Sequence, residues 1–264
     1  MNFKNKTVWI TGASSGIGKA FAIAFSNNGA NVILSARNQE KLFEVKETCK
    51  NPSKVEVLPL DLAHHDTFSS KIKLAIDFFD GVDILINNGG ISQRSYGVDT
   101  DLSVDKKIFD VNYFGTIALT KELLPYFVSN KKGQIVVISS IMGKLGTPLR
   151  TAYAGSKHAL HGFFDSLRAE VYDKNIKVTI ICPGYINTNV SKNALTADGS
   201  KHNINDEGNA NGMLPLVFAN KALKVIYKQK QEVIIAGFKE TSAVYMKRFF
   251  PAVLSKIIQK IKVT

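Results

Sequence analysis

The sequence predicts an α/β fold, in which a doubly wound, parallel, seven-stranded sheet carries helices on both faces as a three-layer α/β/α structure. Short β-rich runs alternate with helical stretches along the chain, which is the pattern of parallel strands joined by helical crossovers. Most of the runs contain consecutive β-branched residues rather than an alternation, as strands buried on both faces do. A chain of 264 residues can form such a sheet as one domain.

Seven runs have the composition of strands, and helical patterns separate them. The expected strands are 6–11, 31–35, 54–59, 82–87, 133–139, 176–182 and 231–236. The expected helices include 16–28, 38–50, 64–79, 103–130 and 153–174. No repeat, low-complexity tract or second domain interrupts this alternation, so we expect a single domain over residues 1–264.

Two regions stand outside the alternation. Residues 189–215 are polar and rich in Asn and Gly, which predicts a long irregular insertion of the kind that forms a substrate lid. Residues 241–264 predict a basic amphipathic helix, because apolar residues recur there at spacings of three and four. That apolar series is Met246, Phe249, Phe250, Val253, Leu254, Ile257, Ile258 and Ile261.

Composition restricts the class of protein. Apolar residues make up 45% of the chain and charged residues 21%, as in ordinary globular proteins. There is no leader-like segment, and no window approaches the roughly 18 uninterrupted apolar residues of a spanning helix. We therefore expect a soluble, cytoplasmic protein in which Cys49 and Cys182, far apart and in no metal or redox spacing, are reduced and buried.

The net charge of +12 is concentrated at the C-terminus, where residues 221–264 hold ten Lys or Arg against two Glu. Two interpretations of the C-terminal helix remain open. It packs on its own domain or a neighbouring subunit with its lysines in water, or it lies on a membrane with Lys and Arg toward anionic headgroups. Nucleic-acid binding is not expected, because the chain has no reader motif and no basic stripe interleaved with aromatics.

A glycine-rich turn, TGASSGIG, follows the first strand and opens the first helix. Gly12 permits the tight turn, Gly16 lets the backbone approach a pyrophosphate, and Gly18 lets the helix pack close to the strand. The helix N-terminus offers free N–H groups and the positive end of a dipole to the phosphates. A glycine-rich turn alone is weak evidence, but its place between a strand and a helix indicates a dinucleotide site.

The spacing of these glycines, G-x3-G-x-G, resembles that of the short-chain dehydrogenase/reductase family, and further motifs follow in order to about residue 190. They are Asp61 in PLDL, NNGG at 87–90 with Gly89 in place of the usual alanine, Asn112 in VNYFG, Ser139-Ser140, Tyr153-x3-Lys157, Pro183-Gly184 and Thr188. The runs DVNYFG, ISSIMGK and AYAGSKHALHGFFDSLRAE narrow the resemblance to one subgroup of the family. The resemblance implies a Rossmann fold and a homodimer or homotetramer formed through the long helices 103–130 and 153–174.

Hydride transfer to or from a carbonyl carbon leaves charge on the oxygen, which needs a proton donor or acceptor. Free tyrosine has a pKa of roughly 10, and a nearby ammonium lowers it by favouring the phenolate. Tyr153 and Lys157 lie one helical turn apart. That pair alone arises often by chance, but Ser140 precedes Tyr153 by 13 residues and Asn112 by 41, as in the family.

The resemblance assigns a role to each of these four residues. Tyr153 would be the general acid/base and Lys157 its activator, which also binds the nicotinamide ribose. Ser140, rather than Ser139, would hydrogen-bond the substrate oxygen because of the 13-residue spacing. Asn112 would kink its helix and hold a water in a proton relay to Lys157.

The cofactor is expected to be NADP(H) rather than NAD(H). NAD enzymes place an acid at the end of the second strand, whereas Ala36 occupies that place here and is followed by Arg37, which can pair with a 2′-phosphate. The alternative is that Arg37 is a solvated surface residue. The full set of expected cofactor-binding residues is Gly12, Ser14, Ser15, Gly16, Ile17, Gly18, Arg37, Asp61, Leu62, Asn88, Gly89, Tyr153, Lys157, Pro183, Gly184, Ile186 and Thr188.

These residues predict an NADP(H)-dependent oxidoreductase that interconverts a small-molecule carbonyl and a secondary alcohol, with the substrate chosen by the 189–215 loop. The alternative is a non-catalytic sensor or scaffold on the same fold. Such proteins typically lose the Tyr, Lys or Ser that this chain keeps. No metal is expected, because His158, His161 and Asp165 share a helix face without a further strong ligand, and a polar face is far commoner there.

Overall fold

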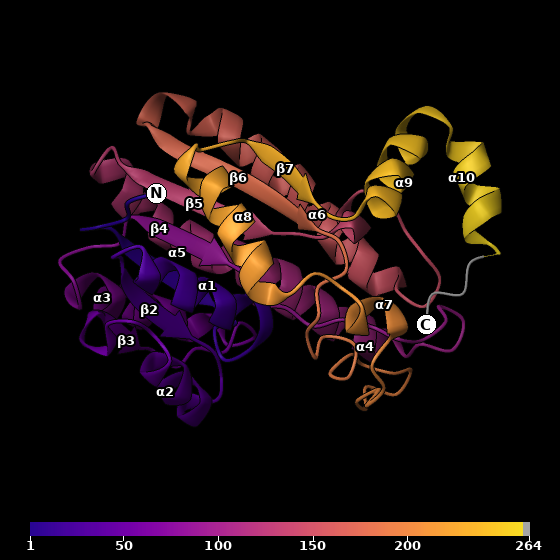
Figure 1. Cartoon of the computed structure of the whole chain (residues 1–264), viewed down its shortest axis with the longest axis horizontal. Coiled ribbons are helices and arrows are strands. Elements are labelled where there is room, and N and C mark those ends of the chain that lie inside the picture. The colour runs from indigo at the N-terminus through magenta and orange to yellow at the C-terminus, as the bar shows by residue number, and fades with distance from the viewer. Residues whose placement is uncertain (261–264) are drawn as a thin grey trace.

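Seven parallel strands form the centre of the molecule, and the computed structural model describes residues 1–260 of the chain. The strands are β1 (Thr7–Thr11), β2 (Asn31–Ser35), β3 (Val55–Val57), β4 (Ile84–Asn87), β5 (Gly133–Ile138), β6 (Ile176–Pro183) and β7 (Glu232–Ile235). They lie in the order β3-β2-β1-β4-β5-β6-β7, with every neighbouring pair parallel. The predicted doubly wound sheet is therefore confirmed (Figure 1).

Two layers of helices cover the sheet (Figure 1). The helices that cover it are α1 (Gly16–Asn27), α2 (Gln39–Glu47), α3 (Phe68–Asp77), α5 (Gly115–Ser129), α6 (Thr151–Glu170) and α8 (Pro215–Tyr227). A further helix, α4 (Leu102–Phe109), packs against α6 instead. One apolar core contains residues of α1, α2 and α8, and a second contains residues of α3, α5 and α6. Because both faces are covered, β1, β4 and β5 are buried along their whole length.

The helix expected over 103–130 is interrupted. A π-type turn over Asp110–Phe114 separates α4 from α5, and Asn112 lies inside it with no exposed surface. The wider turn directs the Asn112 amide to the backbone of Ile91, which the side chain contacts through both of its polar atoms. π turns inside helices are frequent at functional sites, and one continuous helix would not present Asn112 in this way.

The insertion expected at 189–215 follows β6 and contains one short helix, α7 (Glu207–Ala210). Two backbone bridges hold it, one from Gln93 to Leu195 and one from Ile186 to Met213. It ends where Pro215 begins α8, a helix that the sequence analysis did not identify. The insertion therefore lies against the segment that follows β4.

The single C-terminal helix expected over 241–264 is wrong, because the described part consists of two helices, α9 (Phe238–Phe249) and α10 (Pro251–Ile258). Pro251 is the first residue of α10; it has no N–H and cannot continue the hydrogen bonds of α9. Ile261, the last member of the expected apolar series, lies outside the described residues. Figure 1 shows both helices, in yellow, beyond the carboxyl end of β7.

The apolar series of these two helices is divided between two environments. Met246, Leu254 and Ile258 pack against the domain near Tyr153, but only Leu254 is fully buried. Phe249, Phe250, Val253 and Ile257 are exposed. Within residues 1–260, no helix is long and apolar enough to cross a membrane.

Candidate active site

A cavity of about 120 Å³ opens at the carboxyl ends of β4, β5 and β6. It lies near the point where the strand order reverses, between β1 and β4, and parallel α/β sheets bind ligands at such points. Fifteen residues line it: Ile17, Asn88, Gly90, Ile91, Ile138, Ser139, Ser140, Tyr153, Lys157, Pro183, Gly184, Ile186, Thr188, Val190 and Asn209. Three of the four expected proton-transfer residues, Ser140, Tyr153 and Lys157, therefore share one cavity with part of the expected dinucleotide site, whereas Asn112 is not among its lining residues.

The glycine-rich turn after β1 has the backbone that its sequence predicts. Gly12 and Gly16 have φ angles of 64° and 53°, in the left-handed region that favours glycine. A Cβ on Gly12 would lie 2.7 Å from the Cα of Gly89, and one on Gly18 would meet the carbonyl oxygen of Gly12. The turn is thus a narrow cradle of backbone that side chains would fill, which fits the close approach of a pyrophosphate.

Thr11 and Asn88 fix this cradle to the end of β4. The Thr11 hydroxyl accepts hydrogen bonds of 3.0 Å from the N–H groups of Asn88 and Gly89, and the Asn88 amide donates to the Thr11 carbonyl at 2.9 Å. Leu62 packs directly against Gly89, because a Cβ on that glycine would lie 2.6 Å from Leu62 Cδ1. The tight contact explains why a small residue is required at position 89.

Asn112 links the segment after β4 to α6. Its Oδ1 accepts from the Ile91 N–H at 2.8 Å, and its Nδ2 donates to the Ile91 carbonyl at 2.9 Å and to Ser156 Oγ at 3.1 Å. A Cβ on Gly90 would lie 3.0 Å from Asn112 Oδ1 and 3.7 Å from Lys157 Nζ. Asn112 and Lys157 therefore both lie beside Gly90, and no direct hydrogen bond joins them.

Tyr153 and Lys157 face the cavity from the first turns of α6. Lys157 Nζ lies 5.9 Å from the centre of the Tyr153 ring and donates to the Ile138 carbonyl at 3.0 Å. Burial lowers the pKa of Lys157 to about 8. Burial raises the pKa of Tyr153, while a hydrogen bond from Ser140 and the charges of Arg150 and Arg94 lower it. The electrostatics of the phenol thus depend on cations that the sequence motifs do not include.

The two serines at the end of β5 have different surroundings. Ser140 accepts from the Met142 N–H at 3.1 Å and is the serine that interacts with Tyr153. Ser139 also lines the cavity, but its Oγ lies 3.0 Å from Nε2 of His161. This arrangement agrees with the spacing argument that favours Ser140 over Ser139.

The two histidines of α6 are not brought together at one site. His161 points inward, with Nδ1 3.3 Å from Oε2 of Glu232 on β7. His158 is exposed, and its Nδ1 lies 2.8 Å from the carbonyl of Ala154 one turn earlier. Asp165 instead pairs with Arg168, 2.6 Å away on the same helix.

The expected adenine-side residues lie outside the cavity. Arg37 follows β2 and is exposed, with no hydrogen bond or ion pair to any of residues 1–260. Asp61 accepts from the Ala63 N–H at 3.1 Å and lies 3.8 Å from His64. Ser14 and Ser15 belong to the glycine turn that starts α1. These residues are at the carboxyl ends of β1, β2 and β3, where an extended dinucleotide would pass.

The structure adds four polar residues that the sequence analysis missed. Gln93 accepts hydrogen bonds from the first N–H groups of α6, at 2.9 Å from Ala152 and 3.4 Å from Tyr153. Arg94, Arg150 and Asp206 form a buried ionic cluster beside it. Their partners are far apart in sequence, so no local pattern could identify them. The run QRS, within ISQRSYG, indicates only that polar residues follow a strand, and not which distant residues they contact.

The fold and the site together define a class of protein, a dinucleotide-dependent oxidoreductase. The strand order reverses between β1 and β4. The glycine cradle and the Tyr153–Lys157 pair both lie near this point, at the carboxyl ends of the strands. A cradle without side chains accommodates phosphates, and an adjacent acid/base pair serves proton transfer during hydride transfer.

Comparisons with known proteins identify the family. The model for short chain dehydrogenases matches residues 6–199, and the chain belongs to this short-chain dehydrogenase/reductase family. Dehydrogenase/reductase SDR family member 7B of Mus musculus is 42% identical over 260 residues, covering 97% of this chain and 80% of that protein. This relative confirms the family and the subgroup that the motif runs indicate.

Solved structures show the same fold. A short-chain dehydrogenase/reductase from Burkholderia phymatum in complex with NAD has a TM-score of 0.85 at 18% identity and covers 96% of each chain. A short-chain dehydrogenase from Burkholderia cenocepacia in complex with NADP has a TM-score of 0.81 at 21% identity, covering 99% of this chain and 100% of that one.

Proposed function

We propose that this enzyme interconverts a carbonyl and a secondary alcohol with NADP(H), using Tyr153 as general acid/base. The observation that supports this most strongly is the convergence of Ser140, Tyr153 and Lys157 on one cavity next to the glycine cradle. When bound, the nicotinamide supplies or accepts the hydride. The chain's own residues then have to manage the charge and the proton on the substrate oxygen.

In the reduction direction, Ser140 and Tyr153 bind the carbonyl oxygen, and Tyr153 gives it a proton as negative charge develops there. Lys157 stabilises the resulting phenolate through its nearby ammonium, and its desolvation keeps its pKa at about 8. Asn112 holds the backbone of Ile91 beside Lys157 and supplies a position from which a water can return a proton. Oxidation of the alcohol uses the same groups in reverse.

The proposed preference for NADP(H) rests on the end of β2. Ala36 stands where an acid would bind both ribose hydroxyls, and the exposed Arg37 guanidinium follows it. An arginine at this place can form a bidentate pair with a 2′-phosphate. The solvated-surface interpretation of Arg37 predicts no such preference.

The direct test is Tyr153→Phe in the full chain. We expect unchanged NADPH binding in a fluorescence titration and a loss of about 10²–10⁴-fold in turnover, because only the proton donor is removed. Tyr172→Phe, at an exposed tyrosine beyond the end of α6, is the matched control and should change neither. The substrate panel is ketones, aldehydes, steroids and 3-oxoacyl thioesters. Wild-type NADPH binding with no carbonyl reduced would favour the sensor or scaffold, and full activity of Tyr153→Phe would refute the acid/base assignment.

We also propose that the chain is a homodimer through α4 and the π turn over Asp110–Phe114 that follows it. A groove of about 610 Å³ on this face is lined by Leu102, Asp105, Lys106, Lys107, Phe109, Asp110 and Phe114. Two lysines and two aspartates lie in one groove, so a two-fold copy places opposite charges against each other around the apolar residues. Phe114→Glu should shift the protein toward monomer in analytical ultracentrifugation; an unchanged mass would exclude this interface.

For α9 and α10, we propose contact with an anionic membrane surface on the cytoplasmic side. The exposed apolar residues Phe249, Phe250 and Val253 neighbour Lys247, Arg248 and Lys256. A second copy would bring like charges together on this face, whereas anionic headgroups complement it. Cys49 and Cys182 are both free and buried.

Liposome co-sedimentation of the full chain tests this contact. Phe249→Asp should reduce pelleting with phosphatidylglycerol vesicles, and phosphatidylcholine vesicles should pellet little of either protein. Phe43→Asp, at an exposed phenylalanine of α2, is the matched control. Equal pelleting of Phe249→Asp and wild type would exclude the membrane contact.

A further inference from the structure

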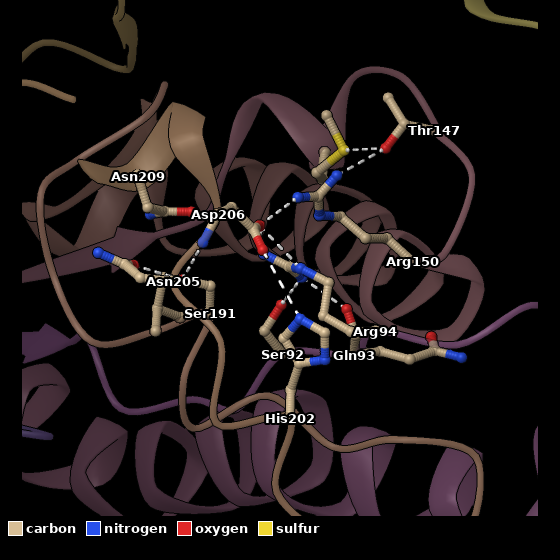
Figure 2. Close-up of polar contacts among 12 residues, drawn as sticks. Ser92, Gln93, Arg94, Thr147, Arg150, Ser191, His202, Asn205, Asp206 and Asn209 are labelled. Carbon is tan, nitrogen blue, oxygen red and sulfur yellow. Dashed lines mark hydrogen bonds and ion pairs between the residues drawn. The ribbon is translucent and has the colours of Figure 1, made fainter. Parts of the chain in front are cut away.

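Three charged side chains form a buried cluster that joins the insertion to the active site (Figure 2). Asp206 of the insertion lies between Arg94, which follows β4, and Arg150, which directly precedes α6. Their side chains are 1%, 3% and 5% exposed. Replacing such a buried ionic group by apolar residues is often neutral or stabilising, so its presence needs an explanation other than stability.

All three side chains are held in place on more than one side. Arg94 Nε donates to Asp206 Oδ2 at 2.8 Å, its Nη2 donates to the same oxygen, and its Nη1 donates to Ser92 Oγ at 3.0 Å. Arg150 Nη2 donates to Asp206 Oδ2 at 3.0 Å. The Asp206 N–H donates to Ser191 Oγ at 3.2 Å, which fixes the insertion (Figure 2). The geometry of the charges is therefore well defined.

The cluster is connected to Tyr153 through the start of α6. Arg150 precedes Tyr153 by three residues. Gln93, next to Arg94, accepts from the Ala152 and Tyr153 N–H groups. The segment 93–94 thus contacts both the insertion and the helix turn that carries the phenol. A displacement of the insertion would be transmitted to Tyr153 through these contacts.

The charges of the cluster do not cancel. Two guanidinium groups and one carboxylate leave one net positive charge, and both arginines lower the pKa of Tyr153 against the effect of burial. The other groups that face this region are Lys157 and Ser140 near the phenol, Tyr185 near Arg150, and His202, whose Nε2 lies 4.0 Å from Asp206 Oδ1. Asp206 is the carboxylate that reduces the field of the two arginines.

We propose that Arg94, Arg150 and Asp206 are positioning residues that set the charge around Tyr153 when the insertion is docked. This rests on the proposed role of Tyr153 as acid/base. The two guanidiniums stabilise the phenolate left after proton donation, and Asp206 both anchors the insertion and limits that stabilisation. The cluster therefore couples the state of the lid to the proton affinity of the phenol.

The test is a tyrosinate titration by ultraviolet difference absorbance, which needs neither turnover nor a known substrate. Each variant is referenced to the same variant carrying Tyr153→Phe, so that only Tyr153 contributes. Arg94→Met and Arg150→Met should each raise the apparent pKa of Tyr153 by about one unit, because a cation is lost. Asp206→Asn should lower it by a similar amount, because a carboxylate is lost.

The double variant Arg150→Met/Asp206→Asn separates charge from structure. It again has one net positive charge, so its titration should return to within a few tenths of a unit of wild type. Arg150→Lys keeps the charge and should titrate as wild type does. Arg168→Met removes an arginine from the same helix, 15 residues beyond Tyr153 and roughly 22 Å away along the axis, and should have no effect.

Two results would overturn the inference. One is an unchanged titration in all of the folded arginine and aspartate variants. The other is a shift in one direction for every variant, with the double variant the most affected, as a purely structural cluster predicts. If Asp206→Asn does not fold, the comparison of Arg150→Met with Arg150→Lys decides. A failure of the proposed function is seen separately, as carbonyl reduction that survives Tyr153→Phe.

Discussion

The nucleotide-binding half and the substrate half of the active site differ in the groups that form them. The nucleotide half, at the carboxyl ends of β1 and β4, is made of backbone and small residues, and its shape depends on left-handed glycines and on hydrogen bonds between Thr11 and Asn88. The substrate half, at β5, α6 and the insertion, is made of buried polar side chains from segments up to 112 residues apart. Backbone conformation and close backbone approach shape the first half, whereas contacts between buried polar side chains shape the second.

The largest effect is expected from Gly12→Val, which should impair cofactor binding by the nucleotide half. Gly12→Val places a β-branched side chain at a φ of 64° and a Cβ 2.7 Å from the Gly89 backbone. Strain and overpacking of about 2–5 kcal/mol should reduce NADPH affinity by about 10²–10³-fold in a fluorescence titration. Gly162→Val, at an exposed helix position where a Cβ meets nothing within 4 Å, should leave the affinity unchanged. Wild-type affinity of Gly12→Val would show that this turn is not the phosphate cradle.

Arg37 is the charged residue of the nucleotide half that we propose to select the cofactor. Arg37→Asp should change the ratio of kcat/KM for NADPH over NADH by about 10–100-fold toward NADH, because a charged hydrogen bond contributes about 1.5–3 kcal/mol. Lys50→Asp, an exposed residue just beyond α2, makes the same change of charge as a control. An unchanged ratio would assign Arg37 to the solvated surface.

The third effect concerns the link between the halves. Gln93→Ala leaves the N–H groups of Ala152 and Tyr153 without their acceptor, at a cost of about 1–3 kcal/mol. We expect a lower free energy of unfolding in urea and a lower kcat, with NADPH affinity retained. Gln39→Ala, at an exposed site, should change none of these quantities. Loss of NADPH affinity in Gln93→Ala would contradict the separation of the two halves.

This difference between backbone and side-chain construction explains which parts of the site the sequence could predict. The strand order and the place of the glycine turn follow from buried β-branched runs and from residues at fixed spacing within one loop. Tyr153 and Lys157 are also a local pair on one helix face. The family resemblance singles out Ser140 and Asn112 by their spacing to Tyr153, and Ser140 is the serine that interacts with the phenol, while the proposed role of Asn112 stays a prediction.

What the sequence could not predict depends on contacts between distant segments. Asp206 lies in a polar insertion among other Asn and Asp residues, and nothing local distinguishes it until the fold brings it to Arg94 and Arg150. The break in the C-terminal helix had a local signal, Pro251, but the apolar periodicity continued across it. The π turn at Asn112 interrupts an apolar pattern that is continuous over 103–130, and only the family resemblance, which implies a kink at Asn112, indicated it.

The smallest expected effect tests how far the polar network of the substrate half extends toward the edge of the sheet. Glu232 on β7 lies 2.7 Å from Lys144 and 3.3 Å from His161, and hydrogen bonding to His161, with Lys144, holds its pKa at about 2, below its usual 4.5. A carboxyl group whose pKa is lowered on folding stabilises the folded state above about pH 4.5. This stabilisation is lost as the pH falls toward 2.

Glu232→Gln should therefore lower the free energy of unfolding near neutral pH, and the difference from wild type should shrink as the pH falls below about 4.5. The carboxylate is 35% exposed, so we expect less than about 1 kcal/mol after screening by solvent. Urea unfolding followed by circular dichroism across this pH range measures the difference, with the exposed Glu170→Gln at the end of α6 as control. A difference that stayed constant with pH would mean that Glu232 stabilises the fold by packing and not by its charge. The ionic interactions of the substrate half would then not extend from α6 to Glu232 on β7.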